Sequence, residues 1–149
     1  MKCAYIFDID GTIADLTHRL RYVLCSDDAK DWDKFYKACY NDRPIPDVIQ
    51  LLKRIDGSGA EIIFVTGRSE ICHDETITWI NRFVGVKEYS VFMRKKNDHR
   101  EDAELKKEIY EKNIQGKHVI LGVFEDRKQC VDMWRGLGLT CYQVADGDY

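Results

Sequence analysis

Apolar residues fall into short continuous runs along the chain, and segments with helical spacing lie between these runs. The runs predict strands at residues 4–9, 61–66, 91–93, 118–124 and 139–144. The periodic segments predict helices at residues 46–57, 72–84, 101–113 and 129–137. Because strands that are apolar throughout are typical of a parallel sheet covered on both faces, the pattern favours an α/β fold.

The alternation of strands and helices predicts a Rossmann-like, doubly wound parallel sheet that takes up the whole chain, residues 1–149. Right-handed crossovers would place the carboxyl ends of all strands at one edge. The exception to the alternation is residues 13–45, which we expect to be mostly helical. This segment is short, so we expect a single domain with a minimal helical cap-like insert.

Aromatic residues in this insert follow helical spacing. Trp32, Phe35, Tyr36 and Cys39 would share one side of a helix. Such spacing favours side chains that face the core. Stacking of these rings on nucleobases is the alternative.

Composition indicates an ordinary globular protein, with 44% apolar and 33% charged residues. The net charge of −3 argues against a protein that coats nucleic acid unspecifically. No apolar run is long enough to span a membrane, and the N-terminus shows no signal-peptide pattern, so we expect a cytoplasmic protein without membrane contact. The six cysteines are scattered, which favours reduced thiols over a zinc site or a disulfide framework.

Two aspartates follow the first apolar run directly. Asp8 and Asp10 lie two residues apart, so a strand would place both carboxylates on one face, and Gly11 allows a sharp turn just after them. The carboxyl edge of an open parallel sheet is where ligands bind. A plain Asp-Gly turn is the alternative, but polar residues at the ends of later strands favour a functional site.

Polar residues also follow the second and fourth predicted strands. Thr66-Gly67-Arg68 comes after the second, and Glu125-Asp126 comes after the fourth. Because the carboxyl ends of parallel strands meet, these residues should share one crevice with the two aspartates. Oxygen ligands at strand ends suit a hard cation such as Mg²⁺. The candidate metal ligands are Asp8, Asp10, Glu125 and Asp126.

These residue types suggest phosphoryl transfer. Asp8 is placed to accept a phosphoryl group as nucleophile, and Asp10 to act first as general acid and then as general base. Thr66 and Lys106 suit the phosphoryl oxygens, and Asp126 suits the metal. Thr66 and Asp126 are also good helix caps, and most helical lysines are solvated, so structural roles remain open for these three residues.

Four sequence signatures together resemble the haloacid dehalogenase-like phosphatases, in that family's order and strand context. The resemblance covers essentially the whole chain. It implies a Rossmann-like sheet, a Mg²⁺ ion and an aspartyl-phosphate intermediate. The matching signatures are Asp8-Ile9-Asp10-Gly11-Thr12, Thr66-Gly67-Arg68, Lys106 and Glu125-Asp126.

Within that family the chain looks like the 3′-phosphatase domains of polynucleotide kinase/phosphatases, as in T-even bacteriophages. The resemblance is carried by Arg19, Arg68, Asp102 with Lys106, and the end of the chain, residues 125–135 and 143–149. It implies that Arg19, Arg68 and Asp102 are needed for phosphatase activity, with both arginines beside the substrate phosphate and the Thr66-Gly67 pair at the phosphoryl group.

Two substitutions distinguish the chain from those domains, because Glu125 stands in place of an aspartate and Thr66 in place of a serine. Both retain the chemistry. No G-x-x-x-x-G-K-[ST] motif occurs, so kinase activity is not implied, and a separate polynucleotide kinase or ligase is an expected partner.

The leading hypothesis is therefore a Mg²⁺-dependent phosphatase that removes 3′-phosphate from DNA or RNA ends in nucleic-acid repair. Many members of the family that the chain resembles carry a large cap domain at this position, which closes over small substrates. The resemblance therefore implies that a site with so short an insert stays open, which favours a polymer end. A phosphatase of free nucleotides or other small phosphoesters is the first alternative. The second is an inactive metal-binding interaction domain, and the intact pair of Asp8 and Asp10 argues against it.

Overall fold

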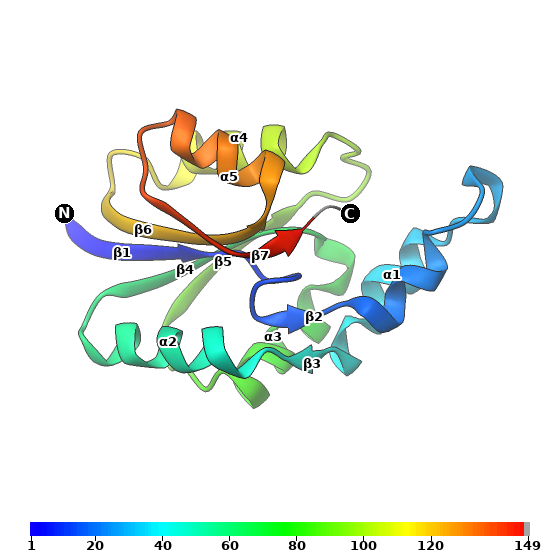
Figure 1. Ribbon diagram of the computed structural model, residues 1–149, viewed down its shortest axis with the longest axis horizontal. Coiled ribbons are helices and arrows are strands. Elements are labelled where there is room, and N and C mark those ends of the chain that lie inside the picture. The colour runs from blue at the N-terminus through cyan, green and yellow to red at the C-terminus, as the bar shows by residue number, and fades with distance from the viewer. Residues whose placement is uncertain (148–149) are drawn as a thin grey trace.

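A five-stranded parallel sheet forms the centre of the molecule (Figure 1). The computed structural model describes residues 1–147, except the side chain of residue 27. The strand order is β5-β4-β1-β6-β7, which is the order of a doubly wound sheet and confirms the predicted fold class. The strands are β1 (Lys2–Phe7), β4 (Glu61–Ser69), β5 (Tyr89–Arg94), β6 (His118–Arg127) and β7 (Cys141–Gly147).

Helices cover both faces of the sheet (Figure 1). On one face lie α4 (Asp102–Asn113) and α5 (Lys128–Gly136), and on the other lie α2 (Pro46–Gly57) and α3 (His73–Phe83). Successive residues of each strand point to opposite faces, so the strands contribute to two cores. The first core contains Ala4, Ile6, Val123, Leu105 and Trp134. The second contains Phe7, Phe64, Phe124, Leu52 and Trp79.

The two central strands hold the site end of the sheet together. Phe7 and Phe124 stack with their ring centroids 4.5 Å apart, and the N–H of Asp8 continues the pairing by donating to the carbonyl of Phe124 over 2.9 Å. The winding direction reverses next to β1, which makes the carboxyl ends of β1 and β6 the topological switch point. Gly11 then turns the chain with φ at 81°, a value that favours glycine.

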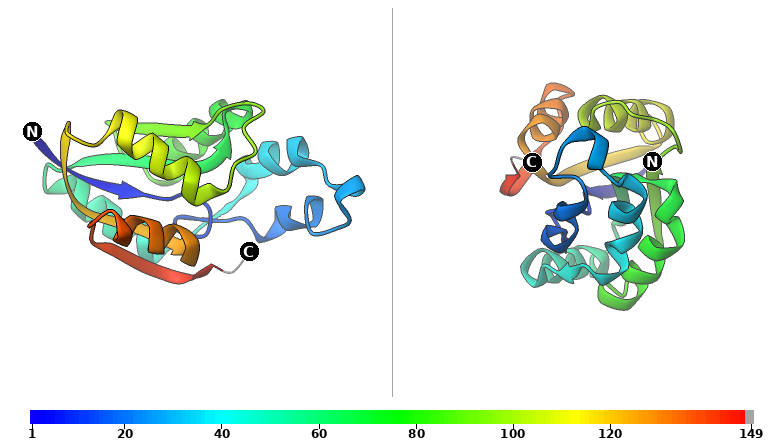
Figure 2. Two further views of the ribbon diagram at one scale, coloured as in Figure 1. Left: turned by 90° about the horizontal axis from the view of Figure 1, so that it is seen from above. Right: turned by 90° about the vertical axis from the view of Figure 1, so that its right-hand side faces the viewer.

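The insert projects from the carboxyl edge of the sheet (Figure 2). A two-stranded antiparallel hairpin, β2 (Ala14–Asp15) and β3 (Arg43–Pro44), forms its base. The sequence predicts that the insert is mostly helical, but the type of helix differs from a regular α-helix. The only α-helix in the insert is the six-residue α1 (Trp32–Lys37). The rest of its helical structure is in the 3₁₀ turns η1 (Thr17–Tyr22), η2 (Asp27–Ala29) and η3 (Ala38–Asn41). No long apolar stripe supports a regular helix here.

Several strand ends differ from the sequence-based boundaries. β4 and β6 extend past residues 66 and 124 because irregular register lets the ladder continue. β7 begins at Cys141 rather than at residue 139, since the N–H of Leu139 still donates to the carbonyl of Trp134 at the end of α5. β7 also includes residues 145–147, beyond the predicted end of this strand at residue 144. Residues 148–149 lie outside the described residues.

Within residues 1–147, the longest helices have 12 residues, and none combines the length and apolar character needed to cross a bilayer. All six cysteines are free thiols. Four are buried, and Cys3 and Cys25 are exposed.

Candidate active site

Three acidic side chains meet at the switch point. Asp8 follows β1, and Glu125 and Asp126 belong to β6. One carboxylate oxygen from each lies within 4.8 Å of the others, and all three residues are at least 95% buried. Parallel pairing of β1 with β6 places these residues together. The predicted convergence of these strand ends is therefore observed.

Lys106 reaches this acid cluster from α4. Its Nζ donates to Asp8 Oδ1 and to Glu125 Oε2, both over 2.8 Å, and the side chain is only 2% exposed. Burial alone would lower the pKa of Lys106, but the carboxylates of Asp8 and Glu125 hold it well above its ordinary value. Lys106 is thus a buried, permanently charged group, and the solvated role left open by the sequence does not apply.

Asp8 is held at both carboxylate oxygens. Lys106 donates to Oδ1, and the buried Thr12 hydroxyl donates to Oδ2 over 3.0 Å. Burial, followed by repulsion from Glu125, raises the pKa of Asp8 to about 7 in spite of Lys106. Thr12 belongs to the motif after β1, but sequence reasoning assigned it no role. The structure places its hydroxyl as the group that orients Asp8.

The acid cluster offers closely spaced oxygen donors. Asp8, Glu125 and Asp126 each contribute one carboxylate oxygen within 4.8 Å of the others. Carboxylate oxygens are the donors that Mg²⁺ prefers. The residues therefore fit the predicted ion through Asp8, Glu125 and Asp126.

Asp10 faces a second cluster instead. Its Oδ1 accepts hydrogen bonds from Arg19 Nη2 over 2.6 Å and from Arg68 Nη2 over 2.7 Å. Burial alone would raise the pKa of Asp10, but Arg68 and Arg19 together lower it to about 2. The Asp10 carboxylate is not part of the three-residue acid cluster. Its predicted role as a metal ligand therefore gains no support from the side-chain placement and stays a prediction.

Asp42 completes this second cluster, and sequence reasoning missed it. It is fully buried at the side chain, and its Oδ2 accepts from Arg19 over 2.7 Å and from Arg68 over 2.9 Å. Trp79 Nε1 also donates to the Asp42 carbonyl over 2.8 Å. The only signal in the sequence is an aspartate just before the insert returns to the sheet. No motif identifies it.

Arg19 and Arg68 have side chains with no exposed surface, and each makes four hydrogen bonds. Their guanidinium groups form a buried bridge between Asp10 and Asp42. This arrangement brings both arginines to the site, as the sequence predicts, and shows what they hold. Direct contact with a substrate phosphate stays a prediction.

The Thr66-Gly67-Arg68 turn is shaped by Asp102. Thr66 is fully buried, and its Oγ1 accepts the backbone N–H of Arg68 over 3.1 Å, so it stabilises the turn rather than a helix end. A Cβ atom on Gly67 would lie 2.6 Å from Asp102 Oδ1. Glycine is needed here because the Asp102 carboxylate occupies that space.

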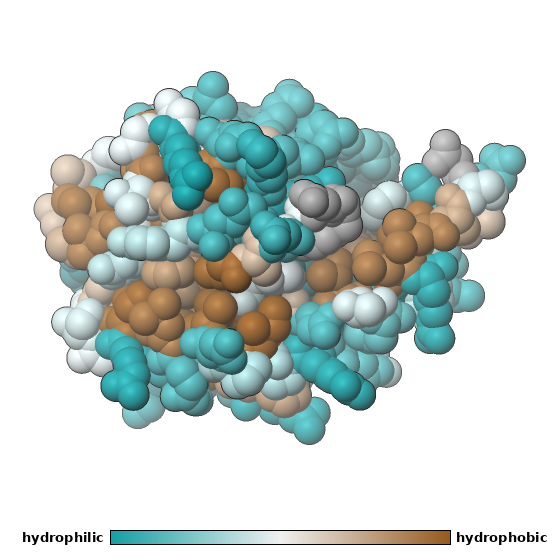
Figure 3. Space-filling model, in the orientation of Figure 1, coloured by the Kyte–Doolittle hydropathy of each residue, from teal (hydrophilic) through white to brown (hydrophobic). Residues whose placement is uncertain are grey.

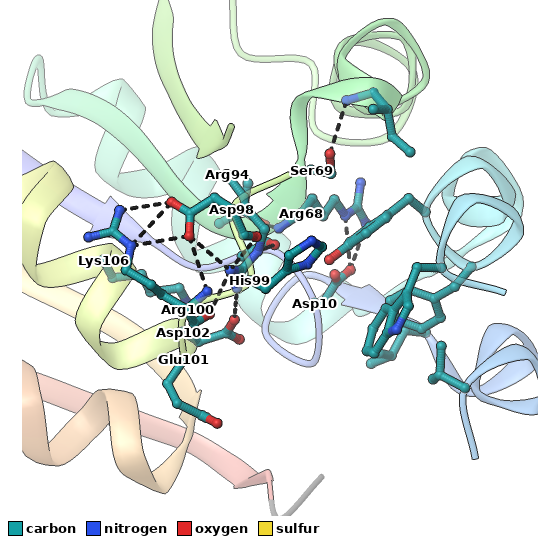
Figure 4. Close-up of a pocket in the computed structure, with 18 of the residues that line it drawn as sticks. Asp10, Arg68, Ser69, Arg94, Asp98, His99, Arg100, Glu101, Asp102 and Lys106 are labelled. Carbon is teal, nitrogen blue, oxygen red and sulfur yellow. Dashed lines mark hydrogen bonds and ion pairs between the residues drawn. The ribbon is translucent and has the colours of Figure 1, made fainter. Parts of the chain in front are cut away.

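Asp102, at the start of α4, bridges two arginines. Arg94 Nη2 donates to its Oδ1 over 2.5 Å, and Arg127 Nη1 donates to its Oδ2 over 2.8 Å (Figure 4). Arg94 also donates to the carbonyl of Gly67 over 2.9 Å. Asp102 therefore ties α4 to β4, β5 and β6 at the site. Arg94 was not singled out from the sequence.

One cleft of about 660 Å³ unites these groups. Asp8, Asp10, Thr66, Lys106 and Asp126 line it, together with side chains of the insert and of residues 94–102. The volume lies within the roughly 300–1,000 Å³ that is usual for ligand clefts. The cleft thus brings together the three-residue acid cluster, Lys106 and a further acid, Asp10, beside two arginines.

Comparison with known proteins identifies the family. Residues 2–149 match the family model for the polynucleotide kinase PNKP phosphatase domain. A protein of Autographa californica nuclear polyhedrosis virus, described as a candidate bifunctional polynucleotide kinase/RNA ligase, is 34% identical over 143 residues. That match covers 95% of this chain and 19% of the viral protein.

Solved structures agree with this result. A chain in the structure of the Pnkp1/Rnl/Hen1 RNA repair complex matches with a TM-score of 0.87 and 31% identity. The match covers all of the present chain and 44% of the chain in the complex. The class C acid phosphatase from Bacillus anthracis has a TM-score of 0.67 and 18% identity over 99% of this chain and 68% of its own, which shows a common fold. The chain spans less than half the length of the viral relative and of the RNA repair chain.

Replacement of Asp42 tests the buried bridge. We expect Asp42→Asn to lower the free energy of unfolding by about 3–5 kcal/mol, because two buried guanidinium groups lose a charged partner. Phosphatase activity should fall as well, since Asp10 loses its support. Thermal unfolding and phosphate release at a temperature well below the transition measure these effects. Asp56→Asn, at an exposed position of α2, is the matched control, and equal behaviour of both variants would contradict this role.

Replacement of Gly67 tests the close approach of Asp102. The new methyl group of Gly67→Ala would displace the Asp102 carboxylate, and a shift of about 1 Å at a site can cost on the order of 10²-fold in rate. Gly57→Ala is the control, because nothing lies within 4 Å of a Cβ there. Phosphate release and thermal unfolding are measured for both. Full activity in Gly67→Ala would show that the site does not depend on this contact.

Proposed function

The chain belongs to the family of polynucleotide kinase PNKP phosphatase domains, and on that premise we propose that it removes 3′-phosphate groups from DNA or RNA ends. Membership makes the chain a phosphatase. The observation that carries the proposed reaction is the placement of Asp8 and Asp10 in one cleft, with an acid cluster beside the first and two arginines beside the second. We propose an aspartyl-phosphate intermediate on Asp8.

In the first half of the reaction, a carboxylate oxygen of Asp8 attacks phosphorus and the bond between phosphorus and the sugar 3′-oxygen breaks. Lys106 and Thr12 fix the Asp8 rotamer, so the nucleophile does not have to reorient. The product strand leaves with a free 3′-hydroxyl, whose proton comes from Asp10.

Asp10 needs a proton for this step, although its pKa is about 2 without substrate, where Arg68 and Arg19 outweigh the effect of burial. Binding of the substrate phosphate would allow Asp10 to be protonated, because a nearby anion disfavours the ionised form of a carboxyl group and raises its pKa. In the second half, water attacks phosphorus, the bond to the Asp8 oxygen breaks, and Asp10 takes the proton from water. Inorganic phosphate leaves and Asp8 is regenerated.

The remaining groups hold the phosphoryl oxygens and the metal. Lys106 already contacts Asp8, so its ammonium group is suited to neutralise charge on the transferred group, and Thr66 lines the same cleft. Asp8, Glu125 and Asp126 would hold a Mg²⁺ ion, which when bound supplies Lewis-acid stabilisation of phosphoryl charge.

The nucleic-acid substrate is proposed from the family and from the open insert. The segment between β2 and β3 is short, which we take to leave the cleft open to a polymer end. The solved relative in the Pnkp1/Rnl/Hen1 RNA repair complex supports an end-repair role and a separate polynucleotide kinase or ligase as functional partner. Hydrolysis of free nucleotides is the competing possibility, because the cleft volume also suits a small molecule.

A substrate panel tests the proposed reaction. A single-stranded oligonucleotide with a 3′-phosphate should be hydrolysed well above the same strand with a 5′-phosphate, above nucleoside monophosphates and above a generic aryl phosphate. Phosphate release is measured for each. Asp8→Asn should abolish turnover while the fold remains intact, because an amide cannot form the phosphoenzyme. Equal rates on mononucleotides and 3′-phosphate strands would overturn the end-repair proposal.

Thermal unfolding with and without Mg²⁺ tests the metal site independently of activity. At a Mg²⁺ concentration of 100 times Kd, binding stabilises by about 2.7 kcal/mol, or about 5–10 °C for a domain of this size. Asp126→Asn should lose most of this increment. Asp132→Asn, at an exposed position of α5, should keep it. The same Mg²⁺ response in both variants would be inconsistent with the assigned ligands.

A further inference from the structure

The helix α1 places an incompletely buried aromatic ring in the wall of the active-site cleft. Trp32 is 47% exposed, whereas Phe35 is 8% exposed. The core role predicted from helical spacing therefore applies to Phe35 and Cys39 but is wrong for Trp32. Trp32 and Tyr36 both line the cleft that contains Asp8 and Asp10. Figure 3 shows apolar residues along the projecting insert on this side of the molecule.

The rings form one packed unit. The centroid of Trp32 lies 5.6 Å from that of Phe35, with perpendicular planes, and 6.0 Å from that of Tyr36. The Phe35 ring lies 4.6 Å below the guanidinium carbon of Arg19, and its carbonyl accepts from Arg19 Nη1 over 3.3 Å. Because Arg19 also holds Asp10, this aromatic platform, Trp32 and Tyr36, has a defined position relative to the catalytic acid.

Another part of the cleft wall carries basic side chains and is held in place by hydrogen bonds. It is the loop after β5, residues 95–100, in which Lys95, Lys96 and His99 are exposed and line the cleft. Arg94 fixes the loop by donating to the carbonyls of residues 98 and 100 over 3.2 and 2.6 Å. Figure 4 shows His99 between this loop and Asp10. The ion pair of Lys95 with Glu70, at 3.6 Å, is highly exposed and therefore weak.

We propose that the cleft is a subsite for an unpaired strand, in which the aromatic platform stacks on a base next to the 3′-phosphate and the loop 95–100 contacts the sugar-phosphate backbone. This inference rests on the proposed function and adds the requirement for a base. Aromatic rings opposite basic side chains form the usual site for single-stranded nucleic acid, since stacking serves any base and cations follow the backbone. A paired base presents no free face, so the subsite selects single-stranded ends.

Charge distinguishes this occupant from an apolar segment of a protein. The loop 95–100 adds lysines to the entrance, although the chain as a whole has a net charge of −3. Lys30 Nζ also lies 6.0 Å from the centroid of the Trp32 ring, so positive charge borders the stacking surface itself. A lysine beside the half-exposed Trp32 ring, with further lysines in the loop 95–100 of the same cleft, fits an anionic, base-bearing chain.

A binding cycle tests the subsite without turnover. In the Asp8→Asn background, binding of a fluorescent trinucleotide with a 3′-phosphate is followed by anisotropy, and the same trinucleotide with an abasic 3′-terminal residue is compared. Trp32→Ala should weaken binding of the complete strand by about 10-fold, the effect of losing one stacked base. It should change binding of the abasic strand by much less. Trp32→Phe, which keeps a ring, should restore most of the affinity.

Two controls separate this result from a folding defect and from failure of the proposed function. Tyr40→Ala, at another exposed aromatic residue of the insert that does not line the cleft, should bind both strands like the parent. Trp79 and Trp134 are buried, so quenching of tryptophan fluorescence by the complete strand should come from Trp32. Equal weakening for both strands, or none for either, would overturn the subsite. Absence of phosphate release in wild type would overturn only the proposed reaction.

Discussion

The architecture of the site depends on one buried network of ion pairs between two arginines and two aspartates. Each of these groups would be costly to bury alone, and together they satisfy one another. Arg68 belongs to β4 and Asp10 lies just after β1, whereas Arg19 and Asp42 come from the insert. The position of the Asp10 carboxylate therefore depends on contacts from both the sheet and the insert.

The neighbouring acid cluster has a different composition. Asp8, Glu125 and Asp126 bring carboxylate oxygens within 4.8 Å of one another, and Lys106 contacts the first two of these residues. Bringing like charges together costs stability. The stacking of Phe7 on Phe124 and the parallel ladder beneath it help to offset that cost. The end of the sheet therefore carries two buried charged clusters that line one cleft.

The sequence was sufficient to predict the sheet and to predict that Asp8, Asp10 and Glu125 share one crevice at its edge, because apolar runs and the geometry of parallel strands determine both. It was not sufficient for Asp42, whose role comes from burial in an irregular segment that has no repeating pattern. Helical spacing placed Trp32 on the same side as Phe35. It could not show that Trp32, at the start of this six-residue helix, would stay exposed.

The hairpin at the base of the insert has a consequence for how such enzymes diversify. The chain leaves the sheet region at Ala14 and returns at Pro44, directly opposite in the antiparallel pair. An exit and a return that adjoin allow the segment between them to be lengthened, shortened or exchanged without moving the strands. Yet Arg19 and Asp42 lie inside that segment. An insert transplanted from another protein would therefore need an arginine and an aspartate at equivalent positions. Without them it could not make the ion pairs with Arg68 and Asp10, whatever specificity it brought.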